Sequence, residues 1–136
     1  MTVYSDAETL YRCLGELFDW AMSSADLGEA LAASGLSFRM YLTDPDGTVS
    51  IDCASRAVEF GAQSSLAARV ELWLTGDAAH ALLAGAINVP LAVAKGTVKA
   101  EGSMATLLMI APVLAPLSAK YLQLADEVTS AALSGP

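Results

Sequence analysis

His80 is the only histidine of the chain, and imidazole serves both as a metal ligand and as a general base near neutral pH. Asp77 stands three residues earlier, so the two side chains share one face of a predicted short helix. A metal site would need further Cys, His or carboxylate ligands at fixed spacing, and none stands nearby in the sequence. We therefore predict a solvated histidine–aspartate pair on a helix surface, with no catalytic residue and no metal site.

The remaining polar residues form no recognisable catalytic motif. The sequence has no glycine-rich phosphate loop, no G-x-S-x-G elbow and no C-x-x-C pair. Asp44, Asp46 and Asp52 cluster around a Pro-Asp-Gly turn, which is typical of a hairpin with a polar sheet face. Cys13 and Cys53 lie far apart in the sequence, and we expect two buried, reduced thiols. These residues predict no cofactor and favour binding over catalysis.

Composition and charge exclude several partners. The 136 residues are 54% hydrophobic, and 15 Asp and Glu against 7 Lys and Arg give a net charge of −8. This charge disfavours nucleic-acid phosphates and lasting contact with anionic membranes. The longest apolar stretch, residues 104–117, contains two prolines and is shorter than the roughly 20 residues of a spanning helix, so we expect no stable membrane insertion. No signal-peptide pattern is visible at the N-terminus, and we expect a cytoplasmic protein. The apolar excess then belongs to a subunit interface or to a cavity for an apolar ligand.

Hydrophobic periodicity predicts the elements that would enclose such a cavity. Apolar residues recur at helical spacing over residues 7–21, and a short second helix ends near Gly35. Alternation predicts five strands, at residues 36–43, 49–53, 56–60, 68–75 and 97–101. Short helices are predicted at residues 78–84 and 90–94, and Met104 begins a strongly apolar helix that Pro112 and Pro116 interrupt or end. The predicted fold class is α/β in the α+β sense, with a mostly antiparallel five-stranded sheet covered on one face by helices.

The segment from Val70 to Leu117 carries a more specific pattern. A strand that ends in Thr-Gly-Asp is followed by a short helix and then by a glycine. A second short helix ends in Lys-Gly and is followed by a strand that contains Lys. Gly-Ser-Met then begins the apolar helix. This order resembles the sterol carrier protein-2-like family, and the residues that fall on its pattern are Gly85, Gly96, Lys99, Gly102 and Met104. The segment before Gly96 departs from it, because Asn88-Val-Pro90 with Val93 replaces an Asn-Pro and a bulkier aromatic residue.

The resemblance implies a single domain over residues 1–136 from a stand-alone bacterial member. An extra C-terminal helix at about residues 117–131 would replace the short tail that ends in a peroxisomal address in eukaryotic members. It also implies an apolar tunnel between sheet and helices that binds and transfers a fatty acid, fatty acyl-CoA, sterol or similar lipid. The residues expected to line it, each with ordinary core packing as the alternative, are Phe38, Met40, Leu74, Leu83, Ile87, Val93, Met104, Leu107, Leu108 and Ile110.

Two other functions stay open at this point. The first is an enzyme that converts a hydrophobic polyketide or steroid-like substrate in the same pocket. The polar residues that could serve it are Tyr11, Tyr41, Asp52, Glu71 and His80. The second is an accessory interaction domain, or a homodimer, whose excess apolar residues form an interface.

Trp73 bears on the interface question. Alternation places it on the sheet face opposite Leu72 and Leu74. There a dimer contact or the C-terminal helix would cover it, or it would stack on Arg69.

Overall fold

The computed structural model describes residue 4 and residues 6–133, with side chains described through residue 127. The helices are α1 (Ala7–Ser23), α2 (Ala25–Ser34), α3 (Gly76–Leu83), α4 (Val89–Lys95), α5 (Met104–Leu114) and α6 (Ser118–Leu133), and a 3-10 turn η1 (Ala115–Leu117) links the last two. The strands are β1 (Ser37–Thr43), β2 (Gly47–Asp52), β3 (Ala57–Phe60), β4 (Val70–Thr75) and β5 (Lys99–Gly102). The predicted boundaries are correct to within about two residues.

The five strands form one sheet in the order β3-β2-β1-β4-β5. Three neighbouring pairs are antiparallel, and β1 with β4 is parallel. The predicted mostly antiparallel, five-stranded sheet is therefore confirmed. Because side chains alternate between faces, Phe38, Met40 and Leu42 of β1 share one face with Leu72 and Leu74 of β4.

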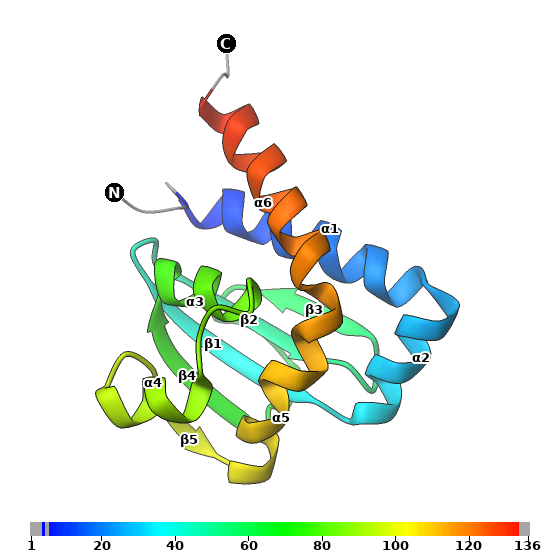
Figure 1. The fold of residues 1–136 in the computed structure, drawn as a ribbon, viewed down its shortest axis with the longest axis vertical. Coiled ribbons are helices and arrows are strands. Elements are labelled where there is room, and N and C mark those ends of the chain that lie inside the picture. The colour runs from blue at the N-terminus through cyan, green and yellow to red at the C-terminus, as the bar shows by residue number, and fades with distance from the viewer. Residues whose placement is uncertain (1–3, 5, 134–136) are drawn as a thin grey trace.

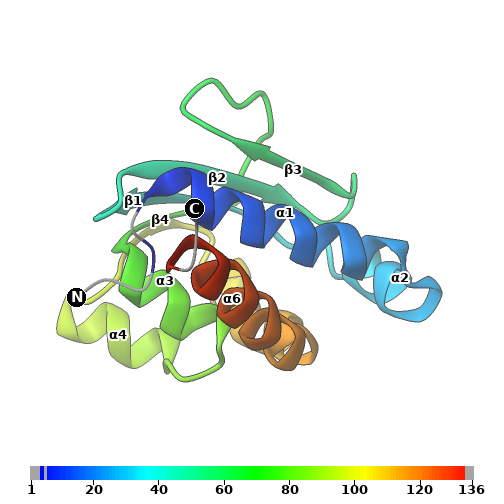
Figure 2. The ribbon, with the colours of Figure 1, turned by 90° about the horizontal axis from the view of Figure 1, so that it is seen from above.

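The helices gather on one side of the sheet, so its two faces differ sharply (Figures 1 and 2). Asp6 caps α1 by accepting a hydrogen bond from the Thr9 N–H (2.8 Å). The buried stripe of α1, which includes Leu10, Leu14 and Leu17, packs toward the sheet and against α6. The helical face of the sheet is therefore the core of the molecule.

The opposite face of the sheet is partly covered by the connection between β3 and β4. These strands are not neighbours, so residues 61–69 cross over β2 and β1. Arg39 holds this connection against the sheet. Its Nε donates a hydrogen bond to Ser50 Oγ (2.9 Å), and its Nη2 donates one to the Leu66 carbonyl. The Arg69 N–H donates to Ser37 Oγ (3.0 Å). Ser37 and Ser50 are consequently buried although they lie on the polar face.

Of the two prolines predicted to interrupt or end the apolar helix, only Pro116 lies at an interruption. Pro112 lies inside α5, Pro116 lies in η1, and α6 follows directly from residue 118. Helical structure therefore extends through this whole region with one tighter turn, and by length and composition residues 104–127 could cross a membrane. One side of it belongs to the core, through Leu107, Ile110, Leu114, Leu117, Tyr121, Leu124 and Ala125.

Candidate functional site

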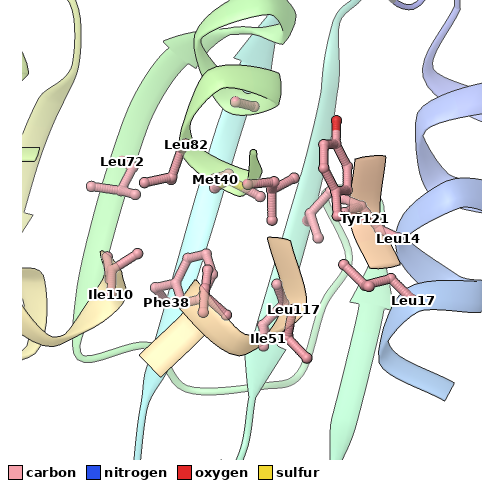
Figure 3. Close-up of a cluster of buried hydrophobic side chains, with 14 of the residues drawn as sticks. Leu14, Leu17, Phe38, Met40, Ile51, Leu72, Leu82, Ile110, Leu117 and Tyr121 are labelled. Carbon is pink, nitrogen blue, oxygen red and sulfur yellow. The ribbon is translucent and has the colours of Figure 1, made fainter. Parts of the chain in front are cut away.

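The region between the sheet and the helices is an apolar cluster without charged side chains. Phe38 and Met40 of β1 face Leu82 of α3, Ile110 of α5 and Leu117 of η1 (Figure 3). Phe38, Met40 and Ile110 have no exposed surface, so no space as large as a water molecule adjoins them. An apolar ligand that enters here must therefore displace side chains or a helix.

The predicted lining residues divide into three groups by position. Six are buried members of this cluster: Phe38, Met40, Leu74, Leu83, Leu107 and Ile110. Ile87 and Val93 are partly buried and pack against it. A lining role for these eight stays a prediction.

Met104 and Leu108 lie elsewhere, with 64% and 51% of their surface exposed. Helix geometry explains the split, because Leu107 and Ile110 occupy the side of α5 that faces the sheet whereas Met104 and Leu108 lie one turn apart on the other side. In the described conformation these two side chains point away from the space between sheet and helices.

Short helices and glycines border the cluster on the α4 side. Gly96 ends α4 with φ +79°, and Gly102 precedes α5 with φ +115°, both in a region that L-amino acids rarely adopt. A Cβ at Gly102 would lie 2.4 Å from the Arg69 carbonyl oxygen, so this position fixes the approach of β5 to the start of β4. A surface cleft of about 230 Å³ lies at α4, lined by the loop before this helix and by the helix itself, with Ile87, Leu91 and Lys95 among its residues. Ile87, one of the predicted lining residues, lies at this cleft.

His80 is not the solvated surface residue predicted from its sequence neighbours. Its Nδ1 lies 2.7 Å from the hydroxyl of Tyr121, and that hydroxyl lies 2.7 Å from the hydroxyl of Tyr4. Tyr4 and Tyr121 are fully buried, and burial raises the pKa of both phenols. Burial lowers the pKa of His80, while Asp77 opposes the shift. A neutral imidazole that accepts a hydrogen bond from Tyr121 satisfies this cluster.

The tyrosine–histidine cluster joins α3, α6 and the segment before α1. Tyr121 lies on the buried stripe of α6, and its hydroxyl points away from the leucines in Figure 3. A buried tyrosine normally needs a hydrogen-bond partner. Sequence reasoning missed the cluster, although Tyr121 recurs at helical spacing with Leu117 and Leu124, and a tyrosine in such an apolar stripe signals that a partner exists.

The polar residues considered for catalysis do not converge on the interior. Tyr41 and Glu71 lie on the sheet face away from the helices, where the Tyr41 hydroxyl donates to Glu71 Oε2 (2.6 Å). Asp52 is on the same face at the end of β2 and accepts from the Ala54 N–H (3.1 Å). Tyr11 stacks on Phe60 at 4.7 Å beside a surface cleft of about 470 Å³. Of the five candidates, only Tyr11 and His80 lie on the helical side.

Metal-ligating residues do not gather either. Within the described residues, no group of three or more His, Cys, Asp or Glu side chains could hold a metal ion. Cys13 and Cys53 are both free and buried, as predicted. Burial raises the pKa of the Cys53 thiol to about 11, which keeps this thiol protonated.

Trp73 lies on the polar face of the sheet, as alternation predicted. It stacks on Tyr41 of the parallel neighbour at 5.0 Å, and Lys99 Nζ lies 5.2 Å from the centroid of its ring. The predicted stacking of Trp73 on Arg69 is therefore wrong. Cover by the C-terminal helix is also wrong, because α6 packs against α1 on the other side of the sheet (Figure 2).

Comparison with known proteins connects this arrangement to one family. The model of the SCP-2 sterol transfer family matches residues 16–115. Sterol Carrier Protein 2 from Yarrowia lipolytica in its apo form superposes with a TM-score of 0.64 at 16% identity, covering 80% of this chain and 89% of that chain. Sterol carrier protein domain 2 of Helicoverpa armigera gives 0.61 at 11% identity, with 82% and 89% covered.

A structure described as UbiJ-SCP2 Ubiquinone synthesis protein gives a TM-score of 0.57 at 11% identity, with 76% of this chain and 85% of that chain covered. A comparison with curated protein sequences gives no match. The structural likenesses show the fold, and the family model spans the whole sheet and helices α2 to α5. The chain belongs to the SCP-2 sterol transfer family, whose members bind lipid-like small molecules.

Proposed function

We propose that this protein binds and transfers an apolar ligand, such as a fatty acid, a fatty acyl-CoA or a sterol, without chemical conversion. The ligand would occupy space that opens between the inner face of β1 and β4 and the helices α3 and α5. One observation carries the proposal: both walls of this layer are apolar, with Phe38, Met40 and Leu74 on the sheet and Leu107 and Ile110 on the helix. Family membership supports the same class of ligand.

Opening the layer is physically reasonable for this set of side chains. Met40 is unbranched and flexible, so it fits apolar ligands of different shape. Each square ångström of ligand surface that leaves water contributes about 25 cal/mol, which offsets the loss of side-chain contacts during opening. The short helix α4 lies beside α5 and ends at the exposed Gly96. A cytoplasmic location is part of the proposal, and the two free thiols support it.

A Leu107→Trp variant tests whether the ligand uses this space. Leu107 is 3% exposed and faces the cluster, so in the opened layer the indole should occupy the volume that a ligand would take. We expect affinity for a fluorescent fatty acid, titrated in solution without vesicles, to fall at least about tenfold. Overpacking a filled core costs about 1–3 kcal/mol of folding stability, and a layer able to open should lose less than that.

Leu122→Trp is the matched control, because Leu122 lies on α6 with 45% of its surface exposed. It should leave fatty-acid affinity within about twofold of the wild type. Equal affinities for the wild type and Leu107→Trp, with the variant folded in a thermal melt, would show that the ligand does not occupy this layer.

A further inference from the structure

An exposed apolar ridge runs along the outer side of α5, η1 and the start of α6. Its members recur at spacings of mostly three and four, so they form one stripe opposite the buried side of the helical region. The ridge consists of Met104, Ala105, Leu108, Pro112, Ala115, Pro116, Ala119 and Leu122, all of them exposed. Met104 and Leu108 thus belong to an outer surface of the protein in this conformation.

The ridge is more apolar than a helix surface in contact with water needs to be. The most apolar 18-residue window in residues 104–127 has a mean hydropathy of 1.5, yet only 33% of that window is buried. Leu91 on the neighbouring helix α4 is also 50% exposed, and α4 contacts α5 on the same side of the sheet (Figures 1 and 2). Contiguous exposed apolar surface of this kind marks a site of contact with another phase or molecule.

Charge indicates what kind of surface the ridge would meet. Residues 102–125 contain no carboxylate, although the chain carries 15. Residues 78–125 hold all three lysines and a single carboxylate, whereas the other residues hold four arginines and 14 carboxylates. Lys95 ends α4, and Lys120 follows the ridge residue Ala119 in α6, with its Nζ 5.5 Å from the centroid of the Trp20 ring. The absence of negative charge removes repulsion from a phosphate-bearing surface.

We propose that the ridge docks on the surface of a phospholipid bilayer and holds the carrier there while cargo is exchanged. The purpose of this docking rests on the proposed function, but docking itself needs no cargo. The ridge lies flat at the level of the headgroups, as interfacial helices do. It does not span the bilayer, because Leu107, Ile110 and Tyr121 anchor the other side of the same helical region in the core. The net charge of −8 keeps the contact weak and reversible.

Sedimentation with phosphatidylcholine vesicles tests the docking, using the full chain freed of lipid. The variant Ala105→Glu/Ala119→Glu places two carboxylates on the ridge without touching the core, because both alanines are exposed. We expect its partition coefficient to be about tenfold or more below that of the wild type. Wild-type binding should persist in 0.5 M NaCl, because apolar contact is not screened by salt.

The matched control is Ala25→Glu/Ala30→Glu, which adds the same charge to exposed positions of α2. It should bind vesicles within about twofold of the wild type. Loss of binding in the control as well, or no wild-type binding at all, would overturn the proposal. So would a wild-type dimer in analytical ultracentrifugation that the ridge variant dissociates, because a second copy would then cover the ridge.

The fatty-acid titration in solution separates this inference from the proposed function. The ridge variant should keep wild-type affinity for the fluorescent fatty acid while it loses vesicle binding. Failed vesicle binding with intact fatty-acid binding overturns the docking alone, and failed fatty-acid binding by the wild type overturns the proposed function.

Discussion

His80 shows how one residue can change its role once the fold places it. Its Nδ1 lies 2.7 Å from the Tyr121 hydroxyl, across 41 positions of sequence. The same hydroxyl meets that of Tyr4, so three elements depend on one small polar cluster in an apolar interior. A satisfied buried network of this kind rigidifies a structure, and removal of one member leaves a buried group without its partner.

The His80→Gln variant should reveal the cluster through the pH dependence of stability. The pKa of His80 is lowered in the folded protein, so the unfolded chain binds more protons below about pH 6.5. The stability of the wild type therefore decreases as the pH is lowered through this range. Glutamine keeps a hydrogen-bond acceptor but does not titrate. We expect the variant to lose about 1 kcal/mol at pH 7.5 and to show a smaller drop in Tm between pH 7.5 and 5.5. Thermal melts at the two pH values measure this, and an equal drop in Tm for the wild type and the variant would contradict the prediction.

At the scale of elements, Gly102 at the end of β5 sets how closely β5 approaches the start of β4. Gly102 has φ +115°, and no space exists for a Cβ beside the Arg69 carbonyl. Gly96 also has a positive φ, but a Cβ there would meet nothing within 4 Å. Substitutions at the two glycines therefore distinguish the cost of backbone strain alone from the cost of strain together with a steric clash.

Gly102→Ala should destabilise the protein much more than Gly96→Ala. The first change adds a clash with the backbone to the strained φ, and we expect a loss of about 2–4 kcal/mol. The second adds only the cost of a left-handed residue, about 1 kcal/mol. Urea unfolding of both variants measures the difference. Equal losses would mean that β5 can move away from Arg69 without penalty.

Elements with a clear hydrophobic period could be predicted from the sequence together with the side that faces the core. For a helix that is apolar on all sides, the sequence predicted the helix but not its buried side. Alternation in residues 36–43 and 68–75 predicted two strands and their inner faces correctly. Residues 104–117 are apolar on every side of the helix, so their period carried no information about which side faces the sheet. Leu107 was therefore grouped with Leu108, although Leu107 is buried in the structure and Leu108 is exposed.

Contacts between distant elements were beyond the reach of the sequence pattern. Trp73 meets Tyr41 because β1 and β4 are parallel neighbours, which follows from the strand order and not from alternation. His80 meets Tyr121 because α6 returns across the helical layer. Both partners are fixed by topology, so local sequence could indicate that a partner was needed without identifying it.

For the whole molecule, the structure divides the apolar excess between two places. One part forms the closed layer between sheet and helices, and the other forms the exposed ridge on α5 and α6. A carrier needs both an interior that can receive a lipid and a surface that can meet a lipid phase. Membership of the SCP-2 sterol transfer family is consistent with this division.

Native mass spectrometry tests the central claim most directly, because it counts bound lipid and subunits in one measurement. The wild type, purified and then incubated with excess fatty acid, fatty acyl-CoA or sterol, should show a 1:1 complex with at least one of them. Leu107→Trp should show much less of that complex under the same conditions. A wild-type spectrum that contains only the free protein with all three ligand classes would contradict the account.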